Sequence, residues 1–355
     1  MHLTSDTEQA PLRSEFVAVG HHGLRLSSGD GIDWAAAHVG KEGEMYRAVA
    51  FGNGRFVAVG SYGGANIFAS TADGETWDTS RQDAGYVNFL RGIGFGKEEF
   101  LGLGGDPGAV GDSRPFVMTT PDGKSWSAAS PVLVTQSLLP NSADSLGGAN
   151  PPPSSKNMLR RVAYGNDLFV AVGDRGRRSV SQDAKAWSDV PNAKAVDTLI
   201  DVAFGNGVFV GVGLHGLRTS TRDGVTWTDR VLGEEGEHIN SIVWTGERFV
   251  AVGQGATFFS ADGLAWERIP TINFPLIAVF GAGVFVGSNW RGRLLRSADA
   301  ITWNDVFQAE HHVEAIAFGW CATRAASAER CDNFRVGRHS SRLRYGQTPE
   351  SPPDV

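Results

Sequence analysis

Arginine recurs at one position of a segment that this 355-residue chain repeats. Arg47, Arg91 and Arg160 each stand four residues before an aromatic residue, and Glu314 has the same place in the last copy. Guanidinium groups make forked, charge-assisted contacts to carboxylates and phosphates, so these positions could together hold an acidic sugar or another anion. They could equally pair with one another for structural reasons. The other copies carry Ile200, Asn240 and Leu276 at this position.

Histidines form a second candidate group, at opposite ends of the repeated region. Two lie near the start of the chain and two near the end of the repeats, next to Glu314. Imidazole and carboxylate groups can bind a transition metal or transfer protons. Their convergence requires that the two ends of the chain meet, so metal binding is the less favoured hypothesis and no cofactor is predicted. The four residues are His21, His22, His311 and His312.

Catalytic residues are harder to assign. A glycoside hydrolase needs two carboxylates roughly 5–10 Å apart, and Glu314 and Asp201 are the candidates, although their copies of the repeat are not adjacent. A polysaccharide lyase would use a base such as His312 while arginines neutralise a uronate. Further side chains in loops suit sugar recognition, since aromatic faces stack on pyranose rings. These ligand-binding candidates are Tyr62, His215 and Trp290, together with Asn240.

The repeat is marked by seven copies of the motif [ST]-x-D-[GA]-x-x-W, which contain seven of the ten tryptophans. Aspartate accepts backbone N–H groups in tight turns, glycine permits positive φ, and tryptophan supplies packing area. The motif residues are therefore predicted to be structural. Ala184 and Ala300 replace the glycine in two copies, where we expect distorted turns. The aspartates are Asp30, Asp73, Asp122, Asp183, Asp223, Asp262 and Asp299.

Each copy reads as four β-strands. Two apolar runs, such as those ending at Phe51 and beginning at Phe56, flank Gly52-Asn53-Gly54, which is a strong hairpin signal. A third run leads into the aspartate motif, and a fourth begins near its tryptophan. Successive motif tryptophans are 37 to 61 residues apart, a spacing typical of propeller blades.

The motif resembles the Asp box, or bacterial neuraminidase repeat, and the chain from about Phe16 to Gly319 resembles the sialidase-like family of Asp-box β-propellers. The resemblance implies that the box lies at the turn between the third and fourth strands. It also implies that ligands bind the opposite face, where the first strands start and the loops between second and third strands lie. Sialidase activity is not carried over, because that family has six blades and a Tyr–Glu pair that cannot be assigned here.

The two ends of the repeated region are complementary. The first copy begins with a second strand at Phe16–Val19, and residues 313–319 match a first strand with no second strand after it. We therefore predict an all-β, seven-bladed propeller of four-stranded antiparallel blades over residues 16–319, closed because the C-terminal strand completes the N-terminal blade. Outside the repeat we expect a flexible N-terminus at 1–15, an insertion loop at 127–157 and a mostly disordered tail at 320–355.

Composition limits the remaining choices. A net charge of −7 offers no basic footprint for nucleic acid, and no apolar run approaches the roughly 18 residues that span a bilayer. The first 16 residues lack the apolar run of a signal peptide, whereas the family resemblance is compatible with an extracytoplasmic location, so the compartment stays open. Cys321 and Cys331 could pair in one disulfide or remain thiols, and they lack zinc-site spacing.

The sequence has many structural motifs, and no group of catalytic residues can be assigned in it. It therefore favours a non-catalytic binding module, which we expect to be monomeric. Its ligand would be a carbohydrate or a protein partner, bound on the face that carries the starts of the first strands. The alternative is a carbohydrate-active enzyme, either a polysaccharide lyase or a glycoside hydrolase, acting on an acidic glycan. A third hypothesis is a scaffold that assists the assembly of another complex.

Overall fold

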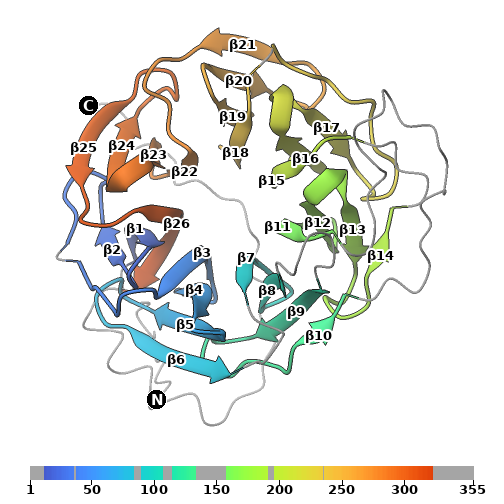
Figure 1. Ribbon diagram of the computed structural model, residues 1–355. Helices are drawn as coiled ribbons and strands as arrows, with labels where there is room; N and C mark the ends of the chain where they lie inside the picture. The colour runs from blue at the N-terminus through green and yellow to red at the C-terminus, as the bar shows by residue number, and fades with distance from the viewer. Residues whose placement is uncertain are drawn as a thin grey trace, which may run out of the picture.

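Seven antiparallel β-sheets are arranged radially around a central axis (Figure 1). The computed structural model describes residues 12–322, apart from 36, 84–88, 107–113, 133–156, 191–195 and 235. Inner strands of successive sheets contact one another all the way around the ring. The predicted seven-bladed β-propeller is thereby confirmed. Among the described residues, no helix is long and apolar enough to cross a membrane.

The first blade joins the two ends of the propeller. Strand β1 (Leu12–Gly20) lies between β2 (Arg25–Ser28) and the innermost strand β26 (Val313–Ala322), with Phe16 opposite Phe318. The predicted closure by the C-terminal strand is confirmed. Both closing strands are longer than expected, since β1 begins before residue 16 and β26 continues past residue 319.

The next three blades each contain four strands that follow one another in sequence. Blade 2 comprises β3 (Met45–Gly52), β4 (Arg55–Tyr62), β5 (Ala65–Thr71) and β6 (Asp78–Asp83). Blade 3 comprises β7 (Leu90–Gly96), β8 (Glu99–Asp106), β9 (Arg114–Thr120) and β10 (Ser130–Pro131). Blade 4 comprises β11 (Leu159–Gly165), β12 (Leu168–Gly173), β13 (Arg178–Ser181) and β14 (Ser188–Asp189), with the 3-10 turn η2 (Asp174–Gly176) between its second and third strands.

Blades 5 to 7 complete the ring. Blade 5 has β15 (Leu199–Gly205), β16 (Val208–Gly213), η3 (Leu214–Gly216) and β17 (Arg218–Thr221). Blade 6 has β18 (Ile239–Trp244), β19 (Phe249–Gly253), β20 (Ala256–Ser260) and β21 (Glu267–Pro270). Blade 7 has β22 (Ile277–Gly281), β23 (Val284–Asn289), η4 (Trp290–Gly292), β24 (Arg293–Ser297) and β25 (Asn304–Gln308).

The outer strand is the weakest part of the pattern. In blades 1 and 5 it is reduced to a single bridge, Arg25 to His38 and Arg218 to Val231, so these sheets have three strands instead of the four expected. Little apolar burial stabilises an outer strand, as the almost fully exposed residues of β6 illustrate, although β6 itself is a complete strand. Of the predicted insertion, β10 lies in blade 3, while residues 133–156 are outside the described residues, as are 1–11, Cys331 and the rest of the tail.

Packing between blades explains the repeated aromatic residues. The second strand of each blade is covered on both faces, and Phe56 to Val59 are completely buried. Phe95 lies flat against Gly52 of the preceding blade, where an added Cβ would come within 2.2 Å of the ring. Phe51 packs in the same way on Gly319 and so closes the ring. The aromatic residue that marks the arginine position is thus the residue that joins adjacent blades.

All seven copies of the aspartate motif form the same turn. One Asp Oδ1 accepts the N–H groups two and three residues later and the hydroxyl of the preceding Ser or Thr. Ala184 and Ala300 adopt φ values of 62° and 64° and keep the same hydrogen bonds. The expectation that these two turns are distorted is wrong. Instead, each alanine adopts a left-handed backbone conformation, which costs free energy at any residue that has a Cβ atom.

Candidate functional site

The residue four positions before each aromatic is a β-bulge. Between Tyr46 and Ala48 the pairing of β3 with β4 skips Arg47, and an equivalent shift occurs in six of the seven blades. A bulge leaves one residue out of the strand pairing and redirects its side chain, which is why bulges often lie next to binding sites. The residues left out are Arg47, Arg91, Arg160, Ile200, Asn240 and Glu314.

Five of these six bulged residues, all except Asn240, line a pocket at the mouth of the central channel. The pocket encloses about 440 Å³, including its open entrance. Four residues that the sequence placed together do lie together in its wall, along with two neighbours. The complete lining is Arg47, Arg91, Arg160, Arg161, Ile200 and Glu314. We call this the arginine pocket.

Two guanidinium groups in the arginine pocket form no salt bridge with a described residue, although Glu314 lines the same pocket. Among the described residues, neither Arg47 nor Arg91 has a carboxylate within 4.0 Å. Both lie over the ring of Phe89, with distances from Cζ to the ring centroid of 4.1 Å and 5.1 Å. Burial, followed by the charges of Arg160 and Arg47, lowers the pKa of Arg91 to about 10. Burial also lowers the pKa of Arg47, while Glu314 opposes that shift.

The other two arginines in the wall are already paired. Arg160 forms a salt bridge with Asp174, which lies in the η2 loop between the second and third strands. Arg161 Nη1 donates to the carbonyl oxygens of Arg91 and Arg160 at 2.8 Å and 3.1 Å. The pairing of Asp174 with a residue at the start of β11 places these loops and the strand starts on one face, as expected. Arg47 and Arg91 are therefore the groups free to take an anion.

Asp201 has a structural environment. Its two carboxylate oxygens accept the N–H groups of Val202 and Ile242, both at 2.9 Å, so it joins blade 5 to blade 6. Burial raises the pKa of Asp201, and Arg161 partly offsets that effect. Asp201 does not line the arginine pocket, whereas Glu314 does. The candidate hydrolase pair is thus not brought together in one pocket.

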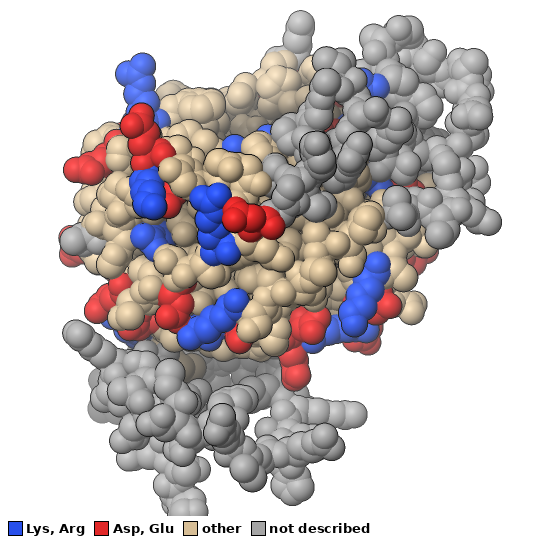
Figure 2. All heavy atoms as spheres, turned by 60° about the horizontal axis from the view of Figure 1, so that its bottom comes forward, with Lys and Arg blue, Asp and Glu red and all other residues tan. Residues whose placement is uncertain are grey.

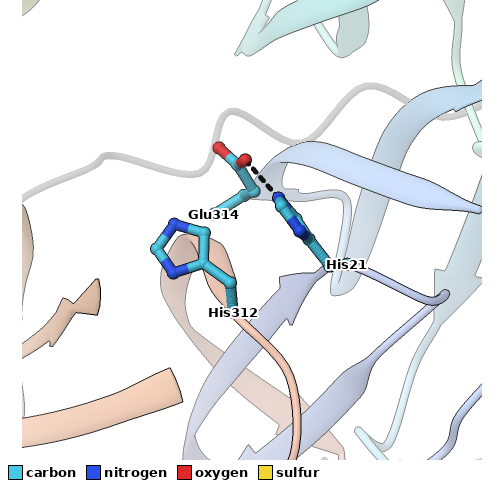
Figure 3. A group of neighbouring side chains, drawn as sticks. All are labelled: His21, His312 and Glu314. Carbon is cyan, nitrogen blue, oxygen red and sulfur yellow. Dashed lines mark hydrogen bonds and ion pairs between the residues drawn. The ribbon is translucent and has the colours of Figure 1, made fainter. Parts of the chain in front are cut away.

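Closure of the ring brings histidines to Glu314. His21 Nε2 is 2.8 Å from Glu314 Oε1, and the three ligand atoms of His21, His312 and Glu314 lie within 4.8 Å of one another (Figure 3). His312 also stacks on the indole of Trp290, with ring centroids 5.2 Å apart. We call His21, His312 and Glu314 the histidine cluster. Glu314 belongs to both the cluster and the arginine pocket.

The remaining candidates lie elsewhere on the same rim. His22 and His311 stack on each other with centroids 4.3 Å apart and are not members of the histidine cluster. His215 is paired with Asp197 at 2.9 Å, and Tyr62 lies beneath Arg81. Asn240 is bulged, and its Nδ2 is buried without a hydrogen-bond partner in the described part of the chain. None of these residues lines the arginine pocket.

Two contributors were missed from the sequence. Phe89, the aromatic platform beneath two guanidiniums, adopts φ of 83° just before β7, a conformation that no local sequence signal predicts. Asp174 lies in the loop between the second and third strands of blade 4, and its pairing with Arg160 depends on the geometry of that loop. On the face drawn in Figure 2, Lys and Arg are interspersed with Asp and Glu.

Comparisons with known proteins establish the fold alone. No family model matches the sequence, and no curated protein matches it. Among solved structures, the chain is similar to YCF48 bound to D1 peptide, with a TM-score of 0.55 and 16% identity over 81% of this chain and 91% of that one. It is also similar to a candidate 6-phosphogluconolactonase from Bacteroides fragilis, with a TM-score of 0.60 and 10% identity over 89% and 99% of the two chains.

A third similar structure is the WD40 β-propeller domain of Doa1, with a TM-score of 0.52 and 10% identity over 84% of this chain and 90% of that one. These similarities identify a β-propeller. At such identities they do not assign the chain to the sialidase-like group of propellers, and they identify no ligand.

Proposed function

We propose that this propeller is a non-catalytic interaction module whose arginine pocket holds a carboxylate group of a protein partner. The observation that carries the proposal is the pair Arg47 and Arg91, two half-buried guanidiniums that form no salt bridge with a described residue and outnumber the carboxylate of Glu314 beside them. A buried charge with no partner costs free energy, and a bound carboxylate would remove that cost. Anion binding is thus favoured by the protein's own electrostatics.

The dimensions of the pocket favour a small acidic group. A pocket lined by only six residues and open at its entrance accommodates a chain terminus, an acidic side chain or part of a single sugar ring. Phe89 restricts the two guanidiniums from one side, so that they present their remaining N–H donors as a fixed fork. A propeller of this fold is described as bound to a peptide, which supports a protein partner over a glycan.

A peptide selection tests the proposal. A display library of random peptides with free C-terminal carboxylates would be selected against the full chain, and enriched peptides would be synthesised as acids and as amides. We expect the acids to bind and Arg91→Met to weaken them by about 10-fold or more, as loss of a charge-assisted hydrogen bond predicts. Enriched peptides that bind Arg91→Met as tightly as the original chain would refute the proposal.

A polysaccharide lyase is the second candidate, because one observation favours it. His21 and His312 lie beside Glu314, which lines the same pocket as Arg47 and Arg91. A lyase needs a base close to arginines that neutralise a uronate. Incubation with uronate polysaccharides, monitored by the ultraviolet absorbance of unsaturated products, distinguishes the candidates. Product formation that His312→Ala abolishes would replace the binding-only proposal.

A further inference from the structure

The histidine cluster contains an imidazole, that of His312, without a hydrogen bond to any described residue. His21 is hydrogen-bonded to Glu314, whereas the ring of His312 makes no hydrogen bond within the described residues. Its Nδ1 is buried without a partner, and burial of an unpaired polar atom costs free energy. The ring is nevertheless held in place, by the stacked indole of Trp290 and the edge of His21. The ordered imidazole of His312 thus lies beside the hydrogen-bonded pair of His21 and Glu314, and its ring nitrogens are available to a ligand.

The backbone fixes the positions of the three side chains. His21 N donates to the carbonyl of His312 at 2.9 Å, and His21 also forms a bridge with Met45 at the start of blade 2. Glu314 is the bulged residue of β26, which directs its side chain toward His21 (Figure 3). His21 directly follows β1, His312 directly precedes β26 and Glu314 lies in β26, so the cluster is held at the paired ends of the two closing strands. Sites built on such rigid elements hold their geometry.

We propose that His21, His312 and Glu314 bind a divalent transition metal ion, Zn²⁺ by ligand type, at the seam where the two ends of the ring join. Two imidazoles and one carboxylate are a common zinc set that leaves a fourth position open. Metal–ligand bonds of about 2.0–2.1 Å place tetrahedral ligand atoms roughly 3.3 Å apart. The present spacing, within 4.8 Å, requires only small side-chain rotations to reach that value. His21 and Glu314 are 33% and 28% exposed, so the ion has a route from solvent.

The site is independent of the proposed function, since a metal can bind whether or not the arginine pocket binds carboxylate. Metal binding would stabilise the closed ring, because the ion would link the residue that follows β1 to residues around the start of β26. Metal that binds only the closed ring stabilises it according to the ratio of free metal to Kd. The open coordination position would face solvent at the rim.

Calorimetric titration of the chelator-treated full chain with ZnCl₂ tests the proposal. We expect one ion per chain and an increase in Tm on saturation. His312→Ala and Glu314→Gln should each weaken binding by more than the roughly 10–100-fold that loss of an outer-shell partner costs. The matched control is His22→Gln, since His22 is adjacent in sequence and outside the cluster. Equal losses in His22→Gln and His312→Ala would mean diffuse binding by surface histidines and would overturn the proposal.

A second measurement does not depend on variants that fold. Titration of the unaltered chain with Co²⁺ should produce the intense visible absorption of four- or five-coordinate cobalt with nitrogen and oxygen ligands. Zn²⁺ should displace it at one equivalent. Only the weak spectrum of six-coordinate, largely hydrated cobalt would contradict a site made of three protein ligands.

Discussion

His21 Nε2 lies 2.8 Å from Glu314 Oε1, although 293 positions separate the two residues. Their contact exists only because β26 pairs with β1 and completes the first blade. Ring closure and site formation are thus one structural event, and the same carboxylate faces both the histidine cluster and the arginine pocket. Loss of the closing strand would therefore remove a side chain from each site.

Arg91→Met should weaken anion binding and stabilise the protein in the absence of ligand. The substitution removes a half-buried charge that forms no salt bridge with a described residue, and it retains an unbranched apolar chain over Phe89. We expect about a 10–100-fold loss of affinity for an acidic peptide, together with a Tm increase of a few degrees by calorimetry. The control is Arg248→Met, which should leave affinity unchanged. Arg248 lies over the ring of Phe259 in the turn between β18 and β19, at the opposite end of these strands from the arginine pocket. A lower Tm in Arg91→Met would show that Arg91 has a structural role instead.

Anion affinity should also fall at high pH. Burial and the neighbouring guanidiniums lower the pKa of Arg91 to about 10, so the group is cationic below that pH and neutral above it. Affinity for a peptide carboxylate, which stays ionised throughout, should be constant up to about pH 9 and decline through pH 10. Fluorescence polarisation with the same labelled peptide measures this. Affinity that stays constant to pH 11 would show that Arg91 keeps its proton there, and so would contradict the lowered pKa of about 10.

The arginine pocket could be predicted because the repeat converts sequence position into spatial position. Residues at equal distances from Phe51, Phe95 and Tyr164 occupy equivalent places around one axis, so Arg47, Arg91 and Arg160 had to approach one another. A β-bulge directs each of these arginine side chains toward the pocket, and no residue type in the local sequence predicts that bulge. Likewise, the φ of Phe89 and the missing outer strands of blades 1 and 5 depend on tertiary packing, which a single repeat does not encode.

The aspartate-motif turns should differ sharply in their tolerance of side chains. Gly123 has φ of 72°, and an added Cβ would lie 2.5 Å from Val57 Cγ2 in the preceding blade. Gly123→Ala should therefore cost about 2–5 kcal/mol in the free energy of unfolding, from left-handed strain plus overpacking. Ala184→Gly, at a turn that already accommodates a methyl group, should change it by no more than about 1 kcal/mol. Denaturant unfolding measures the free energy of unfolding of both variants. Equal changes in the two variants would refute the argument that the contact with Val57 makes Gly123→Ala the more destabilising.

Acid should weaken the same turns. The N–H groups of Leu264 and Ala265 hold the pKa of Asp262 below its ordinary value, and Asp183 is held down in the same way. Because the folded pKa is depressed, the stabilisation is complete above the unfolded pKa of about 3.9 and is lost as pH falls through the lower folded values. Burial raises the pKa of Glu15, whose contribution has the opposite sign. Asp262→Asn should therefore reduce the fall in Tm between pH 5 and pH 2, and an unchanged slope would contradict this origin.

Arg47→Met should strengthen zinc binding at the histidine cluster. The Arg47 guanidinium interacts electrostatically with Glu314, so it opposes any cation that Glu314 binds. A Coulomb energy on the order of 1 kcal/mol for a partly solvated charge predicts about a 3–10-fold lower Kd for Zn²⁺. The gain should shrink in 1 M salt because the Debye length is then about 3 Å. Arg248→Met makes the same change of charge on the opposite face and should leave the Kd unaltered. Weaker zinc binding in Arg47→Met, measured by the same calorimetric titration, would place the ion away from Glu314.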